Sequence, residues 1–174
     1  MKPDEVVQVL QHYRHDLMNH LQIVQGYLSM KKPDKAEAKL KETLDYYNEE
    51  RKLMGLNAPM FMLWLIQFNS RFKNWRINYQ IHTEYKDLRT IDNQLTEQCK
   101  HILSTFRHAL NDTELFEVNL ELNARTNPSQ IQVRLFIDSG DRLEINGDKL
   151  NLSNVVDMDE TTSGISCVFS IPWN

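Results

Sequence analysis

The chain has 174 residues and a formal net charge of −4, from 20 Lys and Arg against 24 Asp and Glu. Nucleic-acid binding needs a concentrated basic face, so this balance speaks against a nucleic-acid partner. Hydrophobic residues make up 41% of the chain, enough for a packed core, and the length suits one ordinary domain or a helical module followed by a small α/β domain.

The two cysteines, Cys99 and Cys167, lie far apart and lack CxxC spacing. A disulfide framework is therefore not expected, and both fall on apolar faces as small core residues. No stretch resembles a signal peptide, and the most apolar run, residues 60–68, is too short to cross a bilayer as a helix. We expect a soluble, cytoplasmic protein that does not contact membranes.

Residues 3–30 are predicted to form an amphipathic helix. Apolar residues recur there at helical spacing, and they are Val6, Val7, Leu10, Tyr13, Leu17, Leu21, Val24, Tyr27 and Leu28. In a heptad that puts Leu10 at position a, His20 falls at d inside this stripe, and His15 falls at f, farthest from it. His20 then reads as a partly buried seam residue, whereas His15 is available to another molecule.

A turn at residues 31–34 is followed by a second predicted helix to about Met54, with Pro33 suited to its first turn. Its apolar edge consists of Ala36, Leu40, Leu44, Tyr47 and Met54. So short a turn makes the two helices antiparallel, and such a hairpin cannot bury both apolar stripes by itself. We expect a homodimer whose hairpins form a four-helix bundle; the alternative is that the hairpin packs on the rest of its own chain.

Residues 55–59, with Gly55 and Pro59, predict a boundary between a helical hairpin over residues 1–55 and a C-terminal domain over residues 60–174. The second domain is expected to be an α+β sandwich with helices on one face of a mixed sheet. Its expected elements are a helix over 60–75, a strand over 76–85, a helix over 93–110 with Asp92 as N-cap, an antiparallel strand pair over 116–122 and 131–137, a candidate short strand over 142–145, and a strand over 165–171.

The polar side of the first helix suggests a phosphoryl-transfer site. An imidazole can attack a phosphoryl group from its neutral form, and His15 stands beside Arg14, whose guanidinium can reach phosphoryl oxygens. Asp16 could orient the ring through one nitrogen, and Asn19 and Gln22 lie on the same side. An isolated surface histidine can equally have no role, so the residues alone leave this open.

Other histidines carry weaker signals. His12 either touches a partner or only decorates the polar face. His101 and His108 lie two turns apart on one predicted helix, but no paired Cys or carboxylate completes a metal site, and they read as packing or surface residues.

The segment Arg14-His15-Asp16-Leu17-Met18-Asn19, with Leu21-Gln22-Ile23 and Gly26, resembles the phosphoacceptor helix of the sporulation initiation phosphotransferase B family of bacilli. The wider group comprises sensor kinases with an RHD-x-x-N-x-L-Q motif. The resemblance implies that His15 takes a phosphoryl group from the aspartyl phosphate of one response regulator. It then passes the group to the aspartate of a second regulator that controls sporulation initiation.

The resemblance and the chemistry of the neighbouring residues together assign roles around His15. The phosphoryl group is expected on the ring nitrogen that faces away from the backbone, with Arg14, Asp16 and Asn19 as supporting residues. Partner-binding residues are expected to be Gln11, His12 and Gln22. Mg²⁺ would belong to the regulator, and no metal or cofactor is expected in this chain.

The resemblance further implies that the C-terminal domain is similar to a histidine-kinase ATP-binding domain that has lost its nucleotide site. His108 stands where a kinase would show Asn, and Asn111 is out of phase. Residues 138–140 begin a glycine loop, but Arg142 takes the place of its second glycine, and Gly147 and Gly164 are isolated. We therefore expect no ATP-dependent autokinase. The alternative function is a non-catalytic dimeric kinase-like protein that binds or inhibits a sensor kinase or a response regulator.

Overall fold

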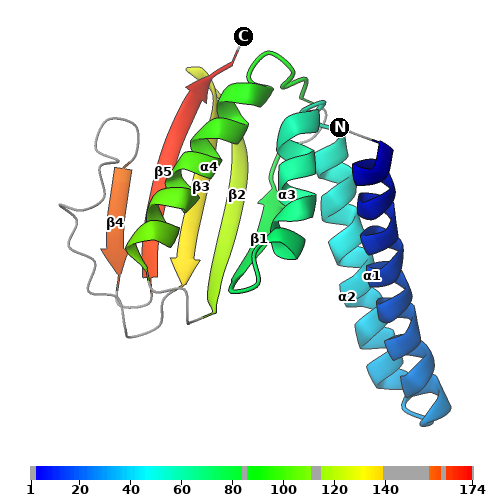
Figure 1. Ribbon diagram of the computed structural model, residues 1–174. Coiled ribbons are helices and arrows are strands. Elements are labelled where there is room, and N and C mark those ends of the chain that lie inside the picture. Colours follow the sequence, from blue (N-terminus) through cyan, green and yellow to red (C-terminus); the bar gives the residue numbers. More distant parts are fainter. Residues whose placement is uncertain (1–2, 84–85, 111–114, 139–156, 162–163, 174) are drawn as a thin grey trace. The chain divides into compact units, whose positions relative to one another are not determined.

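A computed structural model describes residues 3–83, 86–110, 115–138, 157–161 and 164–173 (Figure 1). The chain divides into two compact units, one up to Arg51 and one from Lys52 onward. Among the helices in these ranges, none has the length and apolar character that a membrane crossing would require. The first unit is a helical hairpin and the second is a mixed sheet with helices, which confirms the predicted α+β class.

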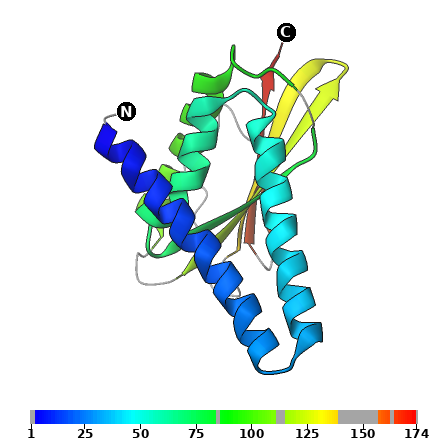
Figure 2. The same cartoon turned by 90° about the vertical axis from the view of Figure 1, so that its right-hand side faces the viewer.

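The first unit consists of α1 (Pro3–Ser29) and most of α2 (Pro33–Met54). Figure 2 shows the two helices running antiparallel from the turn that joins them. In that turn the amide of Lys32 donates to the carbonyl of Tyr27 at 2.9 Å, and Lys31 adopts a left-handed φ of 55°. This hydrogen bond satisfies a carbonyl at the end of α1, and the left-handed residue lets the chain reverse within three residues.

The second unit begins with α3 (Pro59–Arg71) and continues with β1 (Trp75–Ile81) and α4 (Asp92–Ala109). The remaining strands are β2 (Phe116–Thr126), β3 (Ser129–Asp138), β4 (Asp157–Thr161) and β5 (Gly164–Pro172). The sheet order is β1-β2-β3-β5-β4, with β1 parallel to β2 and all other neighbours antiparallel. Figures 1 and 2 show α3 and α4 on the same face of this sheet.

The core of the second unit follows from the alternation of apolar and polar residues along the strands. Every second residue of β2, β3 and β5 is buried against the helices: Phe116, Val118, Leu120 and Leu122; Ile131, Val133, Leu135 and Ile137; Ile165, Cys167, Phe169 and Ile171. The other face of the sheet carries mostly polar side chains, as expected for antiparallel strands with one wet face. Leu53, in the last turn of α2, is also fully buried in this core.

Three sequence-based expectations about these elements need correction or addition. The helix expected over 60–75 ends at Arg71, and Trp75 instead opens β1, because its ring stacks on the cross-strand neighbour Phe116 at 4.9 Å. The strand expected over 76–85 ends at Ile81. Strand β4 was not predicted, since Asp157–Thr161 lacks an apolar alternation and lies at the edge of the sheet. The candidate strand over 142–145 and residues 84–85 lie outside the described residues.

The expectation for Asp92 was also wrong, in an informative way. The N-cap position of α4 is Ile91, and Asp92 is already the first residue of the helix. The two Asp92 carboxylate oxygens instead accept hydrogen bonds from the amides of Met60 and Phe61, both at 2.9 Å. Asp92 thus caps α3 from the neighbouring helix, and the buried carboxylate satisfies two amides that have no partner inside α3.

The outer edge of β1 is covered by a side chain. Asn69 of α3 donates from Nδ2 to the carbonyl of Ile77 at 3.2 Å, and its Oδ1 accepts from the Ile77 amide at 2.8 Å. Arg76 also donates to the carbonyl of Asn69 at 3.2 Å. The peptide groups of Ile77 are therefore paired, although no strand of the described residues lies beyond β1 in the sheet.

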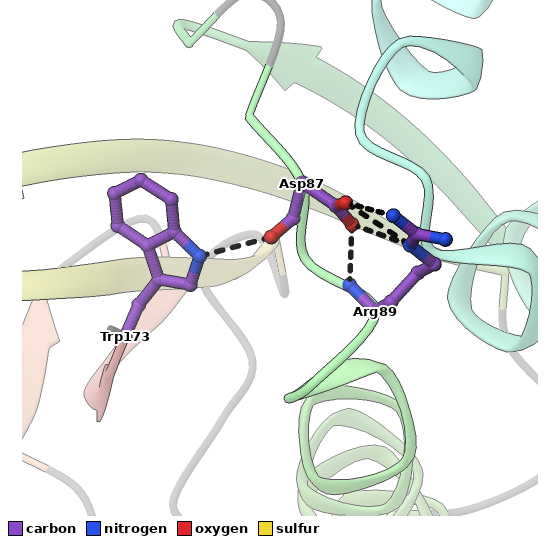
Figure 3. Close-up of polar contacts among 3 residues, drawn as sticks. All are labelled: Asp87, Arg89 and Trp173. Atoms are coloured by element: carbon purple, nitrogen blue, oxygen red, sulfur yellow. Dashed lines mark hydrogen bonds and ion pairs between the residues drawn. The ribbon is translucent and has the colours of Figure 1, made fainter.

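The end of β5 is tied to the segment that precedes α4 (Figure 3). The indole of Trp173 donates to the carbonyl of Asp87 at 3.0 Å, and the ammonium of Lys86 lies 4.8 Å from the centre of the indole ring. The Asp87 carboxylate pairs with the Arg89 guanidinium, whose hydrogen bonds lower the pKa of Asp87. Leu88 then donates to the carbonyl of Leu56 at 2.8 Å, which fastens the linker after α2 to the same corner.

Candidate functional site

Helix α1 presents His15 to solvent. Asp4 and Glu5 lie in the first turn, where negative charge favours a helix N-terminus, and no residue of α1 is buried. The side chain of His15 is 70% exposed. The outward position predicted from the heptad pattern is the position found.

Two side chains of α1 contact the same ring nitrogen of His15. Its Nδ1 lies 3.4 Å from Oδ1 of Asp16 and 3.2 Å from Nδ2 of Asn19. Both contacts are on Nδ1, so the opposite nitrogen, Nε2, is left for another molecule. The structure thus brings together three of the predicted site residues.

The two contacts make opposite demands on the Nδ1 atom. A carboxylate can only accept a hydrogen bond, so Asp16 favours a proton on Nδ1. The Asn19 amide nitrogen can only donate, and it favours a lone pair there unless the amide turns over and presents its oxygen. With the proton on Nδ1, the lone pair of the neutral ring lies on Nε2, which is the form that attacks an electrophile.

The remaining predicted residues are exposed on α1. Arg14, Gln11 and Gln22 make no hydrogen bond or ion pair within the described part of the chain, so their functional groups are available to a partner. His12 is exposed too, but its Nδ1 lies 2.9 Å from the carbonyl oxygen of Gln8, one turn earlier. Among the described residues, no hydrogen bond connects these four side chains to the ring of His15.

His20 lies on the other side of α1, half-buried against α2. Its ring centre is 6.1 Å from that of Tyr46, and its Nδ1 is buried without a hydrogen-bond partner among the described residues. This agrees with its reading as a seam histidine rather than as a nucleophile.

The sequence reasoning missed a polar cluster between the helices of the hairpin. The hydroxyl of Tyr13 donates to Oε2 of Glu50 at 3.2 Å, and the Tyr13 ring packs edge-on against Tyr47 with centres 5.9 Å apart. Glu50 is 2% exposed, and burial raises its pKa, while the Tyr13 hydroxyl acts to lower it. The signal was hidden, because Glu50 stands in a stretch dense in Lys and Glu that reads as a solvated face.

The charge of Glu50 also acts on the tyrosines. Burial, followed by repulsion from Glu50, raises the pKa of Tyr46 to about 12, and the same two causes raise the pKa of Tyr13. Asp16 adds a smaller repulsion at Tyr46 and Tyr47. These phenols therefore stay protonated at neutral pH and serve as hydrogen-bond donors.

The two cysteine thiols of the second unit do not compete with His15 as nucleophiles. Cys99 and Cys167 are buried, and burial raises the pKa of both thiols, that of Cys167 to about 12. Thiols in this state are poor nucleophiles. His101 and His108 are exposed on α4, and no group of three His, Cys, Asp or Glu in the described ranges could hold a metal ion. Several residues used to argue for the loss of a nucleotide site lie outside the described residues: Asn111, residues 139–140, Arg142 and Gly147.

Comparison with known proteins adds an independent line of support. A family model described as the alpha-helical domain of SpoOB-type sensor kinases matches residues 1–56. Sporulation initiation phosphotransferase B of Bacillus subtilis (strain 168) is 28% identical over 135 residues, which cover 78% of this chain and 69% of that protein.

Two solved structures are similar at a coarser level. The histidine kinase domain of the Erythrobacter litoralis blue-light activated histidine kinase aligns over 98% of this chain and 94% of its own, with a TM-score of 0.44 and 15% identity. The catalytic domain of histidine kinase ThkA aligns over 70% of this chain and 92% of its own, with a TM-score of 0.44 and 10% identity.

The sequence matches cover both the hairpin that carries His15 and most of the remaining chain. The helical hairpin that carries His15 is similar to the alpha-helical domain of SpoOB-type sensor kinases, and most of the chain is similar to sporulation initiation phosphotransferase B of Bacillus subtilis.

Proposed function

We propose that this protein is the phosphotransferase of a sporulation phosphorelay and that His15 carries the phosphoryl group. His15 accepts the group from the aspartyl phosphate of one response regulator and passes it to the aspartate of a second. The observation that carries this proposal is the exposed imidazole of His15, whose Nδ1 is engaged by Asp16 and Asn19 while Nε2 stays open. The similarity to sporulation initiation phosphotransferase B of Bacillus subtilis supports the reaction class.

The chemistry needs little from this chain beyond position and charge. The Nε2 lone pair attacks phosphorus, an N–P bond forms, and the P–O bond to the donor carboxylate breaks, with its electron pair leaving on the carboxylate. The Nδ1 proton stays on the ring, which becomes positively charged, and the Asp16 carboxylate balances that charge. The second transfer is the same step in reverse, with the aspartate of the acceptor regulator as nucleophile.

The charged groups around the phosphoryl oxygens come from both proteins. Arg14 is adjacent to His15, and its guanidinium offers a fork of donors to the oxygens. Mg²⁺ is expected in the response regulator, on the aspartate side of the transfer. The exposed Gln11, His12 and Gln22 extend the surface that the regulator would cover.

Homodimerisation belongs to the same proposal. The apolar stripe of the hairpin stays open within one chain: Val7 is 51% exposed, Leu10 62%, Leu28 57% and Leu44 56%. Exposed apolar surface of this extent indicates an interaction site, and a second hairpin offers a matching stripe. A four-helix bundle of two copies would bury the stripe and leave His15 outside.

The test is phosphotransfer from a response regulator charged with acetyl phosphate and Mg²⁺. Wild-type protein should acquire an acid-labile, base-stable label, and His15→Ala should abolish it, because the proposed attachment point is Nε2 of His15. His101→Ala, which removes an exposed histidine of α4, is the matched control and should label normally.

Two further arms separate this function from its competitors. ATP and Mg²⁺ without a regulator should leave the protein unlabelled, since autokinase activity is not expected. If the wild-type protein binds regulators but never acquires label, the proposed phosphotransferase function is wrong. That result would favour the alternative, a non-catalytic binding protein.

A further inference from the structure

His12 differs from the other exposed polar residues of α1 in that its protonation pattern is fixed by the backbone. Its Nδ1 lies 2.9 Å from the carbonyl oxygen of Gln8. A carbonyl oxygen only accepts hydrogen bonds, so Nδ1 of His12 carries a proton in either charge state of the ring. The variable position is therefore Nε2, which holds a lone pair in the neutral ring and an N–H donor in the imidazolium.

The helix brings this nitrogen into the neighbourhood of the phosphoacceptor. His12 precedes His15 by three residues, a spacing at which the β-carbons on an α-helix lie about 5–6 Å apart. The Cα–Cβ bonds of an α-helix tilt towards its N-terminus, so the side chain of His15 leaves the backbone in the direction of the turn that carries His12. The contacts of Asp16 and Asn19 occupy Nδ1 of His15, which leaves its free nitrogen as the one that can face a neighbour.

We propose that His12 is a ligand of the phosphoryl group on His15, donating a hydrogen bond from Nε2–H of its imidazolium to a phosphoryl oxygen. A phosphoryl group carries up to two negative charges, and it is met on this face by Arg14 and His12 as the nearest cationic or protonatable side chains in sequence. The inference rests on the proposed phosphorylation of His15.

The role has a distinct consequence for the relay. A donor that acts only once the phosphoryl group is in place stabilises phosphohistidine relative to the aspartyl phosphates on either side of it. Such a donor therefore changes the equilibrium ratio of phosphorylated phosphotransferase to phosphorylated regulator, and not only the rate at which label reaches His15. A residue that merely helps a regulator to dock would change the rate and leave the division unaltered.

The experiment measures that division with purified protein and a response regulator charged with acetyl phosphate, followed until the label no longer redistributes. His12→Gln, which keeps polarity but cannot become cationic, should lower the ratio of phosphorylated phosphotransferase to phosphorylated regulator by about three- to tenfold. His12→Lys, which restores a cation, should return the ratio towards the wild-type value. His101→Gln is the matched control on α4 and should leave it unchanged.

A spectroscopic arm gives a direct reading of the contact. In protein with ¹⁵N-labelled histidine, the His12 ring signals should move towards imidazolium values when wild-type protein is phosphorylated. They should not move when His15→Ala is mixed with the same charged regulator. Label in the wild type with an unaltered ratio in His12→Gln overturns this inference and leaves the proposed function standing. If label persists in His15→Ala and disappears in His12→Gln, His12 is itself the acceptor, and both this inference and the proposed function are wrong. A wild-type protein that acquires no label would also overturn both.

Discussion

The Nδ1 atom of His15 is where a single side chain should matter most for chemistry. Asp16 can hold its proton and balance the positive charge that the ring acquires on phosphorylation, although the contact is long, at 3.4 Å, and exposed. Replacing Asp16 by Asn keeps a hydrogen-bond acceptor and removes the charge. Since an exposed ion pair is worth about 0.2–1 kcal/mol, we expect transfer to His15 to slow by about two- to fivefold. The measurement is single-turnover transfer from a charged regulator.

A second variant checks that the loss comes from charge. Asn19→Asp places a carboxylate beside the same nitrogen from the next turn of α1, so combining it with Asp16→Asn should recover part of the rate. Equal rates for wild type and Asp16→Asn would mean that solvent alone manages the proton.

At the scale of elements, the N-terminus of α3 depends on a residue of another helix. Asp92→Ala removes the acceptors of the Met60 and Phe61 amides, and we expect a loss of about 1–2 kcal/mol in the free energy of unfolding. Urea unfolding followed by circular dichroism measures it. Asp92→Asn should lose less, because its one amide oxygen still caps an amide, and Glu97→Ala on the exposed side of α4 should lose almost nothing. A change below about 0.5 kcal/mol for Asp92→Ala would contradict the capping role.

The elements also show what sequence patterns can and cannot resolve. Alternation predicted β2, β3 and β5, because one face of each strand is fully buried and the pattern records that burial. The same reasoning failed for β4, whose edge position leaves its composition unconstrained. Asp92 carries a valid cap signature, yet the pattern cannot say which helix is capped, since that depends on tertiary packing.

Some features of the candidate site could also be predicted from the sequence, and others could not. The outward position of His15 follows from helical periodicity alone, and its exposure confirms it. The hydrogen bond between Tyr13 and Glu50 joins residues 37 positions apart, and no periodicity within one helix contains it. The roles of Arg14, Asn19 and Gln22 stay predictions, because side-chain positions on one free chain do not include a regulator.

At the scale of the whole molecule, the open apolar stripe predicts the assembly state. Light scattering at micromolar concentration should give twice the mass of one chain. Leu44→Glu should shift the mass towards a single chain, since a charge buried at an association surface is costly. Leu115→Glu is a matched control, because Leu115 is 61% exposed and belongs to the second unit. A wild type that scatters as a monomer would contradict the four-helix bundle.

Asn69 also affects how the protein associates, because it limits pairing at the edge of the sheet. An open strand edge invites pairing with another chain, and β1 lies at the edge of the sheet. The Asn69 amide imitates the peptide group of an absent neighbour at Ile77, near the middle of that edge, so a foreign strand has to displace it before it can add to β1. The protein thereby keeps association selective: it leaves side-chain surface available on its helices and withholds main-chain hydrogen bonds at this edge of its sheet.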